Sequence, residues 1–134
     1  MSLELEEAEK FRFCELSRED KERVVRVLKE ALEKKSEITL AVLYGSFLKD
    51  YGFRDIDVAV YVCGSMNFLD YKFTLEQELE KTIGLPVDVR VLNKAPPWFI
   101  KKVLEEGRVL IKRTPFIVEK AVSESTRRRK HSEM

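Results

Sequence analysis

The chain has 134 residues, of which 44% are hydrophobic and 37% are charged, and its formal net charge at pH 7 is +1. This length predicts one domain, and the composition is typical of a soluble globular protein. Because the charges nearly cancel, no overall field directs the chain to nucleic acid or a membrane surface, and no apolar run is long enough to span a bilayer.

The first half of the chain predicts one helix and two strands. Ser17 followed by Asp20 is typical of a helix start, and apolar residues at helical spacing predict an amphipathic helix over 18–35. The short apolar run Ile38–Tyr44, rich in residues that favour strands, predicts a buried strand. Apolar and polar residues alternate in Asp55–Val62, which predicts a second strand.

The second half of the chain predicts two helices and two strands. Apolar residues at helical spacing indicate a helix over about 67–83. Alternation in Pro86–Leu92 predicts a third strand. The proline pair at 96–97 opens a further short helix that ends near Gly107, and Arg108–Lys112 is expected to add a last strand.

Five residues with polar or phosphate-binding chemistry are expected at one edge of this sheet. Gly45 and Ser46 follow the first strand, Asp55 and Asp57 begin the second, and Asp88 lies near the start of the third. The short connection between the first two strands favours an antiparallel pair, and the helical crossover favours parallel second and third strands. Residues two apart in a strand share a face. The two aspartates of the second strand therefore point the same way, towards the end where the other three residues lie.

These residue types predict phosphate and metal chemistry. Three converging carboxylates repel one another unless a cation lies between them, and oxygen ligands suit Mg²⁺. Gly45 allows the backbone to approach a phosphate, while Ser46 and the amides of the following turn can donate to an anion. Taken singly, a Gly-Ser pair is most often a turn, and an Asp-x-Asp pair is more often two solvated caps than a metal site. The order in which the features occur along the chain favours phosphoryl or nucleotidyl transfer.

The segments Val42–Phe47 and Arg54–Val60 together resemble the signature of the DNA polymerase β-type nucleotidyltransferase superfamily. Val87–Pro97 and Glu106–Leu110 are similar to later segments of a smaller group within it, the minimal nucleotidyltransferases (MNT). The resemblance covers roughly residues 36–112. It implies an α/β (α+β) fold in which helices pack on a small mixed sheet, the polymerase β-like nucleotidyltransferase core. Eight residues, Phe47–Arg54, separate the Gly-Ser pair from the Asp-x-Asp pair, a shorter spacing than is usual in that family.

The resemblance also implies a role for each matching residue. Asp55 and Asp57 would hold two Mg²⁺ ions, with Mn²⁺ as an alternative, and through them the nucleoside triphosphate. Asp88 would bind the catalytic metal and help to deprotonate the acceptor hydroxyl. Gly45 and Ser46 would bind the phosphates. Lys49 lies where the family often has a basic residue, so it either contacts a phosphate or is a solvated surface lysine.

The resemblance implies a metal-dependent transfer of a nucleoside monophosphate, AMP from ATP, to an acceptor hydroxyl. MNT proteins are often antitoxins paired with a HEPN-domain toxin, and they transfer AMP to a tyrosine of that toxin. Two alternatives stay open. The chain could be a non-catalytic nucleotide-binding module that sequesters a protein partner, or a transferase that modifies a small molecule.

The outer parts of the chain carry further expectations. Residues 1–113 are expected to form the nucleotidyltransferase domain with its N-terminal helix, and 114–134 a basic tail. The basic run at 127–130 is interpreted as a solvated face that could alternatively touch RNA or an acidic partner. Cys14 and Cys63 have no metal-site spacing and are expected to be buried or half-buried thiols. The acidic N-terminus has no signal-peptide pattern, which favours a cytoplasmic location.

Overall fold

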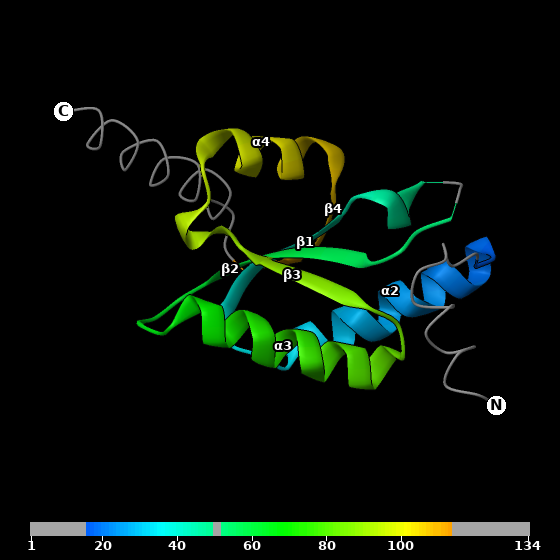
Figure 1. Ribbon diagram of the computed structural model, residues 1–134, viewed down its shortest axis with the longest axis horizontal. Coiled ribbons are helices and arrows are strands. Elements are labelled where there is room, and N and C mark those ends of the chain that lie inside the picture. The colour runs from blue at the N-terminus through cyan, green and yellow to red at the C-terminus, as the bar shows by residue number, and fades with distance from the viewer. Residues whose placement is uncertain (1–15, 50–51, 114–134) are drawn as a thin grey trace.

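The computed structural model describes residues 16–49 and 52–113 of the chain. One mixed sheet runs through them in the strand order β3-β2-β1-β4 (Figure 1). The strands are β1 (Ile38–Tyr44), β2 (Ile56–Val62), β3 (Val87–Val91) and β4 (Arg108–Lys112). The helices are α2 (Arg18–Glu33), α3 (Phe68–Ile83) and α4 (Pro97–Glu106), with short 3₁₀ turns η1 (Ser46–Leu48) and η2 (Leu92–Lys94).

The strand directions are those expected from the lengths of the connections. β1 pairs antiparallel with both β2 and β4, whereas β2 and β3 pair in parallel across the α3 crossover. The predicted strands at 38–44 and 108–112 match β1 and β4 at both ends. The other predicted elements differ from the observed ones by only one or two residues. The predicted fold, helices packed on a small mixed sheet, is therefore confirmed.

Helices cover both faces of the sheet, so the domain has three layers (Figure 1). α2 and α3 pack on one face through Leu28, Leu32, Leu75 and Leu79, which are almost completely buried. α4 packs on the other face, and the core there is smaller. Its buried members are Leu40, Val42, Ala59, Tyr61, Leu92, Ile100 and Val103. The smaller core leaves part of the α4 face of the sheet uncovered near the starts of β2 and β3, where the cavity described below lies.

Local capping explains where α2 and α3 begin. The Ser17 hydroxyl accepts a hydrogen bond from Asp20 N over 3.1 Å, as the sequence pattern predicts. The Asn67 side chain accepts from the first free amides of α3. Gly84 ends α3 with φ of 84°, in the left-handed conformation that glycine adopts most readily. These caps fix the ends of the two helices that cover one face of the sheet.

Three expectations about the periphery have different outcomes. Cys63 is exposed, whereas a buried or half-buried thiol was expected, because it lies just after the last residue of β2, where the chain bends away from the sheet. Cys14 and the basic tail at 114–134 lie outside the described residues. Within the described ranges, no helix is both long and apolar enough to cross a bilayer.

Candidate active site

The start of the β2–β3 pair brings two of the predicted acids side by side. Asp57 and Asp88 are direct partners in the parallel register, and Tyr44 at the end of β1 is the antiparallel partner of Asp57. Strand alternation puts Asp57 on the same face as Ala59 and Tyr61, which α4 covers further along. The predicted meeting of the end of β1 with the starts of β2 and β3 is confirmed.

Asp57 is a half-buried carboxylate, and Arg90, whose charge acts on it, makes its ion pair with Asp88 instead. No ion pair joins Asp57 to another residue in the described part of the chain. Burial, followed by repulsion from Asp88 and Asp55, raises the pKa of Asp57 to about 6. A carboxyl group held near negative charge and partly out of water gains most from a cation at this position.

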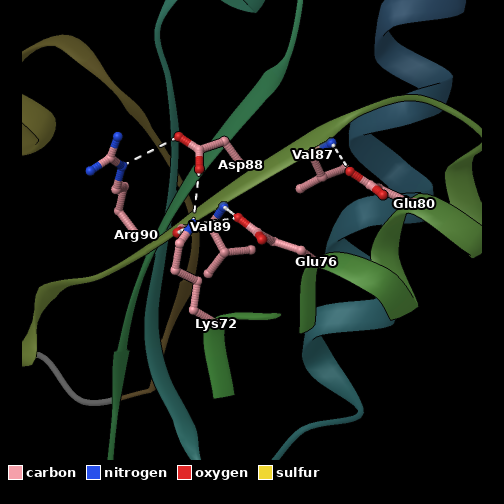
Figure 2. A network of polar contacts seen from close by, with 7 residues as sticks. All are labelled: Lys72, Glu76, Glu80, Val87, Asp88, Val89 and Arg90. Carbon is pink, nitrogen blue, oxygen red and sulfur yellow. Dashed lines mark hydrogen bonds and ion pairs between the residues drawn. The ribbon is translucent and has the colours of Figure 1, made fainter. Parts of the chain in front are cut away.

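Asp88 has the opposite environment, although it is also partly buried. Lys72 Nζ of α3 donates to its Oδ1 over 3.0 Å, and Arg90 Nε donates to its Oδ2 over 3.3 Å (Figure 2). Burial acts to raise the pKa of Asp88, but the hydrogen bond and charge of Lys72, with those of Arg90, outweigh it and lower the pKa. Asp88 is therefore ionised near neutral pH and can act as an acceptor of protons or cations.

Gly45 lies directly against the Asp57 carboxylate. Its φ is 84° and its ψ is −159°, a combination that is accessible almost only to glycine. A Cβ atom at this position would collide with Asp57 Oδ2. The η1 turn follows at once, with Leu48 N donating to Gly45 O over 3.2 Å. The Gly-Ser turn and Asp57 therefore form one compact unit, with Ser46 as the first residue of η1.

Asp55 and Lys49 are less closely joined to this unit. Asp55 is exposed, one residue before β2, and its charge contributes to the raised pKa of Asp57. Among the described residues, no three acidic, histidine or cysteine side chains are arranged to hold a metal ion, so the role of Asp55 as a shared ligand stays a prediction. Lys49 is exposed and lines a second cavity, which it shares with Lys21 and Arg108 but not with the acids.

Asp57 and Asp88 line a cavity of about 650 Å³ on the α4 side. Its wall includes residues that the sequence interpretation missed, namely Tyr44, Arg90, Lys94 and Phe99. The rings of Tyr44 and Phe99 meet edge to face at 5.8 Å, and Phe99 meets Trp98 in the same way. Trp98 is 63% exposed, which excludes a place in the core. Arg90 was detectable in the sequence, since it lies two residues after Asp88 and so shares its face.

A family model described as "Polymerase beta, Nucleotidyltransferase" matches residues 26–116, which is more than half of the chain. No curated protein matches the chain.

Several solved structures share the fold. A chain from a structure of the toxin-antitoxin MntA-HepT is 19% identical at a TM-score of 0.55, covering 87% of this chain and 90% of that chain. A chain from tri-AMPylated Shewanella oneidensis HEPN toxin in complex with MNT antitoxin is 20% identical at a TM-score of 0.56, covering 85% and 87%. A toxin-antitoxin structure with AMP-PNP gives 21% identity and a TM-score of 0.58, covering 88% and 90%.

Proposed function

This chain belongs to the polymerase beta nucleotidyltransferase family, and we propose that it transfers a nucleoside monophosphate, AMP from ATP, to an acceptor hydroxyl on a partner protein. The observation that carries the proposal is the pairing of Asp57 with Asp88 beside the Gly45 turn, in the wall of a cavity. Acids and a backbone turn of this kind are what nucleotidyl transfer requires together.

The donor set fits a divalent cation. Asp57, Asp88 and Asp55 offer only oxygen ligands, and Mg²⁺ prefers such ligands. Burial, followed by repulsion from Asp88 and Asp55, raises the pKa of Asp57, and a bound cation would offset both effects. When bound there, Mg²⁺ or Mn²⁺ would screen the triphosphate and stabilise the charge on the attacking and leaving oxygens. Asp57 and Asp55 would hold the cation with the nucleotide, and Asp88 would share it.

The chain's own residues then have separate tasks in the reaction. Gly45 and Ser46 would place the phosphates, because Gly45 brings the turn directly against Asp57 and Ser46 offers a hydroxyl donor at the start of η1. Asp88 would accept the proton of the acceptor hydroxyl. The hydroxyl oxygen forms a bond to the α-phosphorus as the bond from that phosphorus to the bridging oxygen breaks, and pyrophosphate leaves. Lys49 could add a longer-range phosphate contact, since it follows the same turn.

The acceptor is proposed to be a side-chain hydroxyl of a helical, HEPN-type protein. The fold neighbours come from toxin–antitoxin structures, and one of those structures contains an AMPylated HEPN toxin. The wide cavity beside the acids is bordered by Trp98, whose side chain is largely exposed. Large exposed aromatic residues beside a reactive site are typical of the anchors by which a protein partner binds.

Mass spectrometry of a co-expressed HEPN-type partner tests this proposal. The partner should gain the mass of one or more AMP groups with the wild-type chain and none with Asp88→Ala, although the complex still forms. The matched control is Asp70→Ala, which removes an exposed acid from the first turn of α3. If the partner is neutralised equally by Asp88→Ala and never gains a nucleotide, the chain is a sequestering module and the proposal is wrong.

A further inference from the structure

We propose that Lys72 is a positioning residue for Asp88. From the outer edge of β3 it fixes one carboxylate oxygen of Asp88, so that the other oxygen can take part in the reaction. This inference rests on the proposed function, in which Asp88 accepts the proton of the acceptor. No feature of the sequence around Lys72 predicts the role. It follows from where α3 lies against the edge of the sheet.

β3 lies at the edge of the sheet formed by the described strands, so none of those strands pairs with the outer side of its backbone. Side chains of α3 take the place of that strand (Figure 2). Glu80 Oε1 accepts from Val87 N over 3.0 Å, and Glu76 Oε2 accepts from Val89 N over 2.8 Å. Lys72 Nζ donates to Val89 O over 2.8 Å. These α3 residues are spaced four apart, so they form one stripe of the helix.

Lys72 connects this stripe to the acid. Its ammonium group donates to Asp88 Oδ1 at 3.0 Å, to Val89 O and to Glu76 Oε2 at 2.5 Å. An ammonium group has three N–H donors, and three acceptors surround this one. The side chain of Lys72 is 24% exposed and that of Glu76 is 16% exposed. The position of Nζ is therefore fixed by the backbone of β3 and by α3, and Oδ1 of Asp88 is fixed with it.

The second cation on Asp88 is held much less firmly. Arg90 makes one ion pair to Oδ2, at 3.3 Å, and its side chain is 59% exposed. An exposed pair of this kind contributes little to stability, so Arg90 can leave Oδ2 at small cost. Lys72 cannot leave Oδ1 without giving up its other two partners. The two oxygens of Asp88 thus differ: Oδ1 is anchored by Lys72, and Oδ2 is held by the more exposed Arg90.

The alternative is that Lys72 only closes the edge of the sheet. Glu80 provides the matched control, because it accepts from Val87 N on the same stripe, whereas the hydrogen bonds and ion pairs of the described residues do not join it to Lys72 or Asp88. Glu80→Ala should therefore weaken the edge alone. Lys81→Met controls for loss of a lysine from α3, since Lys81 is exposed.

The experiment compares Lys72→Met, Lys72→Arg, Glu80→Ala and Lys81→Met in the full chain. It measures Mn²⁺ binding by calorimetry in the presence of a non-hydrolysable ATP analogue, thermal unfolding, and kcat and KM for AMP transfer to the partner. Lys72→Met should lower kcat and Mn²⁺ affinity by about 10–100-fold, the usual effect of losing a group that orients a metal ligand, with a smaller change in KM for ATP. Lys72→Arg should recover part of both losses. Glu80→Ala should lower the unfolding temperature but leave kcat and Mn²⁺ affinity within about twofold of wild type.

The double variant Lys72→Met with Asp88→Asn separates the two explanations. If Lys72 acts through Asp88, the double variant is no slower than Asp88→Asn alone, because the effects of residues that act as a unit do not add. Losses that multiply would overturn the proposal, and so would a Lys72→Met variant whose kcat and Mn²⁺ affinity match those of Glu80→Ala. A wild-type chain that transfers no AMP would instead contradict the proposed function, while its Mn²⁺ affinity relative to Lys72→Met would still report on Lys72.

Discussion

The starts of β2 and β3 carry the same residue type in the same register, yet the two aspartates have opposite environments. The pKa of Asp57 is raised to about 6 by burial and by repulsion from Asp88 and Asp55. The pKa of Asp88 is lowered, because Lys72 and Arg90 outweigh its burial. Differently tuned neighbouring acids are typical of sites where each has its own task. In the proposed mechanism, Asp57 needs a bound cation to offset its burial and repulsion, whereas Asp88 is already held by Lys72.

The largest expected effect of breaking this pair is on the reaction. Asp88→Asn removes the proton acceptor and should lower AMP transfer by about 10²–10⁴-fold. Asp57→Asn removes charge from the proposed cation site and should be comparably inactive. The measurement is the rate of AMP incorporation into the partner, with Asp70→Asn as the exposed control on α3. Transfer at the wild-type rate by either variant would remove that acid from the mechanism.

The same two variants should have opposite effects on the stability of the metal-free protein. Asp57→Asn removes a repelled carboxylate and should raise the free energy of unfolding at pH 7. Asp88→Asn weakens the contact with Lys72 and should lower it by about 1 kcal/mol. Chemical denaturation in the presence of a chelator measures both. Shifts of the same sign would mean that the two environments do not differ as described.

The pH dependence sharpens this test. The folded protein binds the Asp57 proton more tightly than the unfolded chain does. The pKa of Asp57 is about 6 in the folded protein, against the ordinary value of 3.8 for an aspartate in an unfolded chain. The stabilisation from this proton is complete below about pH 3.8 and is lost as the pH rises through about 6. The stability advantage of Asp57→Asn over wild type should therefore grow from pH 4 to pH 7 and then level off. A constant difference over that range would contradict the raised pKa.

Two glycines with the same φ of 84° allow a smaller, local test of the turn beside Asp57. Gly45→Ala should lower stability by about 1–3 kcal/mol and impair nucleotide binding, because the new Cβ displaces the Asp57 carboxylate. Gly84→Ala, whose Cβ meets nothing within 4 Å, should cost about 1–2 kcal/mol and leave binding intact. Unfolding curves and nucleotide titrations separate the two. Equal nucleotide affinity of the two variants would show that Gly45 is needed only for the backbone conformation of the turn and not for nucleotide binding.

Lys49→Ala is expected to have the smallest effect. Lys49 is exposed and lies beside a cavity that the acids do not line. Loss of an exposed charge typically changes an interaction by about 0.2–1 kcal/mol, which corresponds to a change in KM for ATP of about fivefold at most. A larger increase in KM would place Lys49 in direct contact with the triphosphate.

The acid pair was predictable from the sequence because strand alternation and connection length alone determine it. Asp57 and Asp88 follow from the antiparallel β1–β2 connection and the α3 crossover, and Gly45 follows from its place after β1. The partners of Asp88 were only half predictable. Arg90 shares its strand, but Lys72 depends on how α3 is rotated against the sheet edge.

The remaining differences arise from loops and element ends, where periodicity gives no guide. Lys49 follows the η1 turn, and the path of the chain there decides which cavity it lines. The sequence does not decide whether Trp98 is buried, because a short helix that begins with prolines can present its first residues either way. Its 63% exposure places it on the surface beside the site.

The most direct test of the central claim, that Asp57 and Asp88 form a cation-dependent nucleotide site, is calorimetric titration of a non-hydrolysable ATP analogue. Wild type should bind the analogue with Mg²⁺ present and lose most of that affinity in a chelator, since a triphosphate and three carboxylates repel one another when unscreened. Asp57→Asn should bind weakly in both conditions and show little response to Mg²⁺. Equal affinity of the wild-type chain with Mg²⁺ and with chelator would contradict the account.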